Sequence, residues 1–86
     1  MSFALRADVT ATETEHGTVL LDQRRGRYYQ LNPTGALALR ALLDGAGTEG
    51  AARALCETYG IPAQRAEADV AALLESLRGR RLAARR

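Results

Sequence analysis

Residues that could perform catalysis are few in this chain and widely separated. His16 is the only histidine and lies in a polar stretch, where a surface position is expected. Cys56 is the only cysteine and follows Leu55 in a predicted helix, which favours a small packed thiol. One histidine and one cysteine cannot form the ligand pattern of a zinc site, and a nucleophilic Cys/His pair would need both in one cleft.

Carboxylates and glycines add no catalytic pattern. Glu13 and Glu15 lie in the polar stretch, while Glu67 and Asp69 lie in a later helix, so no acid/base pair can be assembled from the sequence. The glycines form neither G-x-G-x-x-G nor a phosphate-binding loop. The sequence therefore predicts a protein that is not an enzyme, with no catalytic residue, no metal and no cofactor.

Composition is typical of a single small globular domain, residues 1–86. Of the 86 residues, 47% are hydrophobic and 26% are charged. No stretch approaches the ~18 apolar residues of a membrane span, and the N-terminus lacks the apolar core of a signal peptide. A single cysteine excludes an internal disulfide, so a cytoplasmic location is expected.

The formal net charge of +2 is too small to argue for nucleic acid, but the charge is unevenly distributed. All 12 basic residues are arginine, and those near the C-terminus are Arg78, Arg80, Arg81, Arg85 and Arg86. This cluster is either a solvated tail or a patch for an acidic peptide or a phosphate backbone.

Three strands are predicted in the first third of the chain. Apolar residues alternate with polar ones over residues 3–10, and residues 12–17 form a polar connection that ends in glycine. Residues 18–22 and 27–31 are further strands, separated by a tight turn in which Gly26 is placed to adopt a left-handed conformation. These strands are expected to form a meander whose third strand lies at an edge.

Three helices follow, over residues 33–44, 48–59 and 62–78. Asn32 and Pro33 are typical of an N-cap and the first helical position, and Gly45 of a C-cap. Thr48 is the predicted N-cap of the second helix, and Gly60 its end. The predicted fold is α+β: a three-stranded antiparallel meander followed by three helices packed on one face, in a winged-helix-like arrangement.

Two binding functions are compatible with this layout. The second and third helices look like a helix-turn-helix, which would make a nucleic-acid-binding protein. However, the exposed positions of the third helix carry Glu67, Asp69 and Glu75, which phosphates would repel. Besides the two binding functions, the layout is also compatible with a purely structural subunit of a larger enzyme.

The second binding function is recognition of a peptide by strand addition. Residues 27–31, "RYYQL", contain no proline and a single arginine, so little protects this edge from pairing with another strand. The period of two puts Tyr29 on the same face as Leu31, and Tyr28 with Gln30 on the other. If Leu31 faces the core, the apolar face of the third helix would lie near this edge and complete a groove.

The stretch "GTVLLDQRRGRYYQLNPTGALALRALLDG", followed by "TEGAARALCETYGIP" and a third amphipathic helix, resembles the PqqD-like family. Its members are recognition elements for the precursors of ribosomally made, modified peptides, and the match is closest to stand-alone versions that serve lasso peptide biosynthesis. The resemblance implies a non-catalytic protein that binds the leader of a precursor peptide along the third strand. It also implies a leader of the Tyr-x-x-Pro type, delivered to a separate leader peptidase and afterwards to a cyclase.

Carried onto this sequence, the resemblance implies a peptide-binding site with a strand wall and a helix wall. The strand wall comprises Arg27, Tyr28, Tyr29, Gln30 and Leu31. The helix wall is drawn from Asp69, Val70, Leu73, Leu74, Leu77 and Arg78. No membrane partner is expected, and a nucleic-acid partner is disfavoured.

Overall fold

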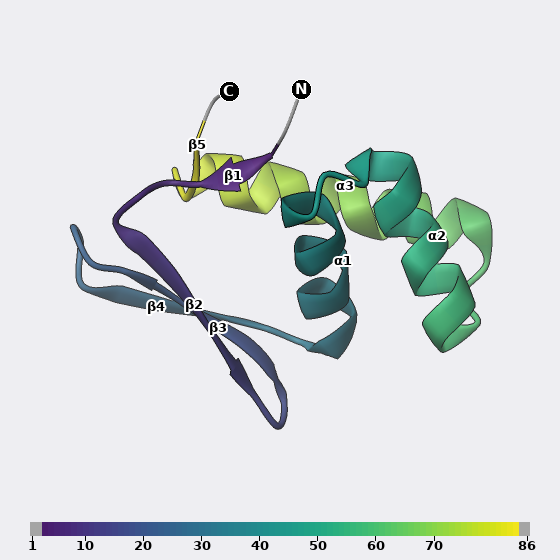
Figure 1. Cartoon of the computed structure of the whole chain (residues 1–86), viewed down its shortest axis with the longest axis horizontal. Coiled ribbons are helices and arrows are strands. Elements are labelled where there is room, and N and C mark those ends of the chain that lie inside the picture. The colour runs from purple at the N-terminus through teal and green to yellow at the C-terminus, as the bar shows by residue number, and fades with distance from the viewer. Residues whose placement is uncertain (1–2, 85–86) are drawn as a thin grey trace.

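The structure of the protein is a computed structural model, which describes residues 3–84. Four strands precede three helices, and a short strand closes the described chain (Figure 1). The elements are β1 (Ala4–Leu5), β2 (Val9–Thr14), β3 (Gly17–Asp22), β4 (Arg27–Leu31), α1 (Pro33–Leu43), α2 (Gly47–Tyr59), α3 (Ala63–Gly79) and β5 (Ala83–Ala84). The predicted α+β class, with a meander followed by three helices, is confirmed.

The meander has the strand order β2–β3–β4 and is antiparallel throughout. Leu20 on β3 lies opposite Ala11 on β2 and Tyr29 on β4, so these three side chains share one face of the sheet. That face is the buried one, because Leu20 is fully buried. Helix α1 packs against β3 and β4, and α2 and α3 pack against α1 (Figure 1).

The first predicted strand, residues 3–10, is wrong in its extent. The chain turns at residues 7–8, where the N–H of Val9 donates to the carbonyl of Arg6 (3.0 Å), and this turn separates β1 from β2. β2 continues to Thr14, through residues predicted to be a connection. Its side chains beyond Val9 are all exposed, so no alternation of apolar and polar residues marks this edge strand in the sequence.

Strand β1 pairs instead with β5, which the sequence analysis missed. Ala4 lies opposite Ala84 and Leu5 opposite Ala83, and the N–H of Arg6 extends the pairing by donating to the carbonyl of Leu82 (2.9 Å). This contact joins the two ends of the described chain, and it fixes the position of the residues that follow α3.

Helix boundaries follow local capping signals where those signals are strong. The Asn32 Oδ1 accepts from the N–H of Gly35 (2.8 Å), and Pro33 occupies the first helical position, as predicted. Gly60 ends α2 in a left-handed conformation with φ 67°. The predicted cap at Thr48 is wrong: α2 begins at Gly47 after Ala46, and no side chain caps it.

The core lies between the sheet and the helices. Its largest fully buried apolar side chains come from β3, α2, α3 and the segment after α3: Leu20, Leu55, Val70, Leu77 and Leu82. Leu39 and Leu42 of α1 also belong to it. Within residues 3–84, no helix combines the length and apolar character needed to cross a membrane.

Gly17 allows the start of β3 to lie close to the end of β4. Its φ is +131°, and a Cβ added there would run into the carbonyl oxygen of Leu31, at the end of β4. We therefore expect Gly17→Ala to lower the free energy of unfolding by ~2 kcal/mol or more, measured by denaturant titration.

The matched control is Gly79→Ala, at the end of α3. Gly79 has an ordinary φ, and an added Cβ would meet nothing within 4 Å. This variant should be as stable as the wild type or slightly more stable. Equal stability of the two variants would contradict the role assigned to Gly17.

Candidate functional site

Strand β4 is an open edge of the sheet. Among residues 3–84 its only neighbouring strand is β3, so the alternate backbone N–H and C=O groups that point away from β3 have no strand partner. Its five residues span ~17 Å, enough to pair with an extended peptide of similar length. Neither proline nor a covering strand blocks this edge within the described residues.

The two faces of β4 differ as the period of two predicts. Tyr29 and Leu31 lie opposite the buried Leu20 and Thr18, and both are half-buried against the core. Tyr28 lies on the other face and is 71% exposed. A strand added to β4 would therefore meet Tyr29 and Leu31 on one face and Tyr28 on the other.

The C-terminal end of α3 lies beside β4. The guanidinium carbon of Arg80 is 4.6 Å from the centroid of the Tyr29 ring, a cation–π distance. The Arg80 Nε–H also donates to Ser76 Oγ (3.3 Å), one helical turn earlier. These two contacts show which flank of α3 adjoins the open edge.

Helical periodicity extends this flank along α3. Residues spaced by three or four positions lie on the same side of a helix, so Asp69, Leu73, Ser76 and Arg80 form one stripe. We call this stripe the strand-side flank of α3. Leu73 is 9% exposed, the largest value among the buried apolar residues of α3, and lies where the core meets this flank.

The predicted helix wall divides into three groups. Val70 and Leu77 are each 1% exposed and belong to the core. Asp69 and Leu73 lie on the strand-side flank. Leu74 and Arg78 are four residues apart and lie ~130° and ~170° around the helix from the middle of that flank, since each residue turns the helix by ~100°.

Sequence reasoning missed Ser76 and Arg80. Both continue the spacing set by Asp69 and Leu73, at seven and eleven residues beyond Asp69, so helical periodicity could have found them. Arg80 was counted with the C-terminal arginine cluster instead. Its position is decided by the turn after α3, where the N–H of Leu82 donates to the carbonyl of Leu77 (2.9 Å) and Leu82 is fully buried.

Asp22 anchors the hairpin that presents β4. This carboxylate has 0% exposure, accepts from Arg6 Nη2 (2.9 Å), and accepts from the N–H groups of Arg24 (3.1 Å) and Arg25 (3.3 Å) in the turn. Burial alone would raise the pKa of Asp22. The N–H of Arg25, the charge of Arg6 and the N–H of Arg24 oppose it and hold this pKa below its usual value.

Hydrogen bonding around Asp22 is incomplete among the described residues. Asp22 Oδ2 and Arg6 Nε have no hydrogen-bond partner. Arg6 Nε is nevertheless 3.4 Å from Asp8 Oδ1, an ion-pair distance without hydrogen-bond geometry. Arg6 thus joins the turn after β1 to the start of the β3–β4 hairpin.

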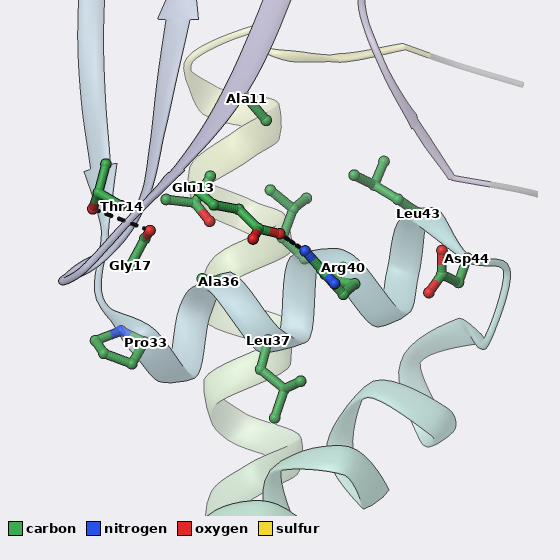
Figure 2. A pocket seen from close by; sticks show the side chains of 12 residues that line it. Ala11, Glu13, Thr14, Gly17, Pro33, Ala36, Leu37, Arg40, Leu43 and Asp44 are labelled. Atoms are coloured by element: carbon green, nitrogen blue, oxygen red, sulfur yellow. Dashed lines mark hydrogen bonds and ion pairs between the residues drawn. The ribbon is translucent and has the colours of Figure 1, made fainter.

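A separate cleft of ≈ 440 Å³ lies between the β2–β3 hairpin and α1 (Figure 2). Its lining includes Leu37 and the 39% exposed Leu43, and an ion pair between Glu13 and Arg40 links the strand to the helix (Figure 2). Both charged side chains are exposed, so this pair adds little stability. None of the predicted site residues lines this cleft, because it opens on the β2 side of the sheet.

The groups considered for catalysis lie apart. His16 is exposed in the β2–β3 turn, and Cys56 is a half-buried free thiol in α2. Over residues 3–84, no three His, Cys, Asp or Glu side chains come together as metal ligands. The arrangement that remains is an open strand edge flanked by one side of a helix, which is a geometry for binding an extended chain.

Comparison with known proteins places this fold in a family. Residues 17–83 match the family model "Coenzyme PQQ synthesis protein D (PqqD)", and the chain belongs to the PqqD family. A search of curated proteins found no match.

Two solved structures are similar over nearly the whole chain. The first, "Lasso peptide synthetase B1 complexed with the leader peptide", is 40% identical, with a TM-score of 0.89, and the match covers 99% of this chain and 100% of the other. The second, "TbiB1 in Complex with the TbiA(beta) Leader Peptide", is 24% identical, with a TM-score of 0.81, and the match covers 96% of this chain and 94% of the other. The second supports the fold alone.

The lowered pKa of Asp22 predicts a specific acid sensitivity. Because the folded-state pKa is below that of the unfolded chain, the stabilisation is complete above about pH 4 and is lost as pH falls through the folded-state value. Thermal unfolding of the wild type should therefore occur at lower temperature as the pH decreases below about 4.

Asp22→Asn tests this origin, because it keeps the shape of the side chain and removes its titration. The variant should unfold at lower temperature than the wild type at neutral pH, but its melting temperature should fall less below about pH 4. Parallel pH profiles for the two proteins would show that Asp22 does not carry the acid sensitivity.

Proposed function

We propose that this protein binds the leader of a ribosomally made precursor peptide by strand addition to β4. The observation that carries the proposal is the open β4 edge beside the strand-side flank of α3, brought together by Arg80 and Tyr29. A 40% identical structure, described as a lasso peptide synthetase B1 in complex with a leader peptide, supports the same function. The protein acts without catalysis, as a recognition element in lasso peptide biosynthesis.

Backbone pairing supplies the part of the affinity that is independent of sequence. Each outward N–H and C=O of β4 can pair with a leader residue, as in other cases of strand addition. An isolated leader is extended and solvated, so ordering it costs conformational entropy that these bonds and the side-chain contacts must offset.

Side-chain contacts supply the specificity. Alternate leader side chains point to opposite faces of the enlarged sheet. Those on the core face meet Tyr29, Leu31 and the exposed part of Leu73, while those on the outer face meet Tyr28 and Gln30. A leader tyrosine and proline, spaced as Tyr-x-x-Pro, are the anchors expected from the family resemblance.

The helix wall of this site is the strand-side flank of α3. Arg80 at the end of this flank lies over Tyr29 of β4, and the proposed wall extends from it through Ser76, Leu73 and Asp69, whereas Leu74 and Arg78 lie on the opposite flank. Val70 and Leu77 support the site from the core. Arg27, at the start of β4, is exposed on the same face as Tyr29.

Binding the leader would place the rest of the precursor within reach of the enzymes that process it. The proposed recipients are a separate leader peptidase and then a cyclase, acting in the cytoplasm. Holding one end of a flexible substrate raises its effective concentration at an associated enzyme to ~mM for a short tether. Such an adaptor needs no catalytic group of its own.

Nucleic-acid binding by α2 and α3 is supported less well. The two helices pack together, and a short connection with Gly60 joins them. The exposed surface of α3 nevertheless carries Glu67, Asp69 and Glu75, which would repel phosphates.

The flank assignment can be tested by blocking one side of α3. Ser76→Tyr adds a large ring on the strand-side flank at an exposed position, and it should weaken binding of a fluorescein-labelled leader by about tenfold or more. The probe is a synthetic leader peptide of the Tyr-x-x-Pro type, and fluorescence anisotropy measures the dissociation constant.

Ala71→Tyr is the matched control, because Ala71 is equally exposed but lies on the same flank as Leu74. It should change the dissociation constant by less than about twofold, as a surface substitution away from the site. A loss of binding in Ala71→Tyr alone would move the site to the opposite flank.

Strand addition makes a second prediction, which hydrogen exchange can test. On leader binding, the outward N–H groups of β4 should exchange more slowly, by about tenfold or more, because each gains a carbonyl partner. NMR-detected exchange resolves single amides.

The exposed edge of β2 serves as the internal control. It belongs to the same sheet but lies on the other side of β3, so its exchange should not change. Protection confined to β2, or absent from β4, would contradict strand addition to β4.

A further inference from the structure

The guanidinium of Arg80 is held in place beside the open edge of β4. Its Cζ lies over the Tyr29 ring, 4.6 Å from the ring centroid, and its Nε–H donates to Ser76 Oγ (3.3 Å). Of its N–H groups, the bond to Ser76 uses one. The four N–H donors on its two terminal nitrogens have no acceptor among residues 3–84.

The backbone beneath Arg80 is also fixed. The N–H of Arg80 donates to the carbonyl of Ser76 (3.0 Å), and the N–H of Arg81 to the carbonyl of Arg78 (3.0 Å). Arg81 then adopts a left-handed φ of 58°, which turns the chain toward the buried Leu82. The Cα of Arg80 therefore has a defined position beside β4, which lowers the entropy lost when the guanidinium receives a ligand.

Positive charge is concentrated at this end of the site. Arg27 lies two residues before Tyr29 on the same face of β4, and Arg81 follows Arg80 in the turn. The ion pairs within residues 3–84 involve other arginines: Arg6, Arg24, Arg40 and Arg65.

Nearby carboxylates do not neutralise this charge. Asp22 lies opposite Arg27 but is buried and paired with Arg6. Asp69 lies three helical turns before Arg80 along α3, and its Oδ2 is 4.0 Å from Arg65 Nε. The remaining acid close in sequence, Glu75, forms no ion pair with Arg78 or Arg80.

We propose that Arg80 is a specificity-determining residue, and that it selects a leader with an aspartate or glutamate at the position facing Tyr29. This inference rests on the proposed strand addition. A strand added to β4 would lie ~4.8 Å from it, and a residue directly opposite Tyr29 on the core face would have its Cβ ~5 Å from that of Tyr29. A carboxylate there reaches the guanidinium lying on the Tyr29 ring.

The chemistry of the pair accounts for the selection. A planar guanidinium with free terminal donors can give two parallel N–H···O bonds to a carboxylate, which neither an amide nor an ammonium side chain can match. The contact with Tyr29 and the bond to Ser76 hold the guanidinium in one orientation. Tyr29 thus both contacts the peptide and positions the arginine that recognises its carboxylate.

The test uses a fluorescein-labelled synthetic leader of the Tyr-x-x-Pro type that contains Asp and Glu residues, with copies in which each Asp or Glu in turn becomes Asn or Gln. Dissociation constants are measured by anisotropy for the wild type, Arg80→Gln and Arg80→Lys. One neutralised copy should bind the wild type about tenfold more weakly than the parent leader. The same copy should bind Arg80→Gln as tightly as the parent leader does, because the pair is already broken.

Two controls separate this pair from charge in general. Arg78→Gln removes the same charge from the opposite flank of α3 and should keep the about tenfold preference for the acidic leader. Arg80→Lys keeps the charge without the planar fork and should lose most of that preference.

Each outcome is decisive. If every neutralised copy binds the wild type as tightly as the parent leader does, selection by Arg80 is overturned, while the proposed leader binding stands. The same conclusion follows if a leader without Asp or Glu binds as tightly as the parent leader. If Arg78→Gln loses the preference as fully as Arg80→Gln, the selection belongs to diffuse charge and Arg80 has no special role. If no leader binds the wild type, the proposed function fails, and this inference fails with it.

Discussion

The buried carboxylate of Asp22 is the interaction on which the presentation of β4 depends. It sits at the end of β3, caps two N–H groups of the following turn, and pairs with Arg6 from the turn after β1. Burying a carboxylate costs free energy unless a positive charge and hydrogen-bond donors compensate it. The folded protein therefore keeps the end of β3, the following turn and the turn after β1 in this arrangement. The strand that leaves the turn after β3 is β4. An open edge can serve as a docking surface only if it is fixed in this way, because a mobile strand would lose more entropy on pairing.

The second constraint is the pairing of β1 with β5. It fastens the segment after α3 to the start of the chain and buries Leu82, so the turn at residues 80–81 has a defined position. Arg80, although exposed, consequently lies over the Tyr29 ring. Two contacts between distant parts of the chain, Asp22 with Arg6 and β1 with β5, thus position the open edge of β4, the strand-side flank of α3 and the guanidinium of Arg80. The cleft between α1 and the β2–β3 hairpin lies toward the β2 edge of the sheet, away from β4, and shares none of the predicted site residues.

Local signals predicted much of the fold because their physics is local. Asn32 with Pro33, Gly26 and Gly60 mark a helix start, a hairpin turn and a helix end, and each acts through its own φ or its own side-chain hydrogen bond. The same reasoning failed at Thr48, where the helix begins one residue earlier without a side-chain cap. It also failed at β2, an edge strand whose residues beyond Val9 are all exposed, so burial left no alternation to detect. The two faces of β4 were predictable, because side-chain alternation in a strand has a period of two.

For the proposed site, the sequence by itself determined an aromatic edge strand, with Tyr29 and Leu31 on one face and Tyr28 and Gln30 on the other. It also determined that the apolar stripe of α3 would be buried, which Val70 and Leu77 show. Only the tertiary structure decided which flank of α3 adjoins β4, because the rotation of a helix against a strand depends on packing between elements far apart in the chain. That packing separates Asp69 and Leu73 from Leu74 and Arg78, and it turns Arg80 from one arginine of a charged tail into a group held on Tyr29. The physical reason is that a hydrophobic pattern specifies which residues are buried, whereas the contact between β1 and β5, about 80 residues apart, specifies where the end of α3 lies.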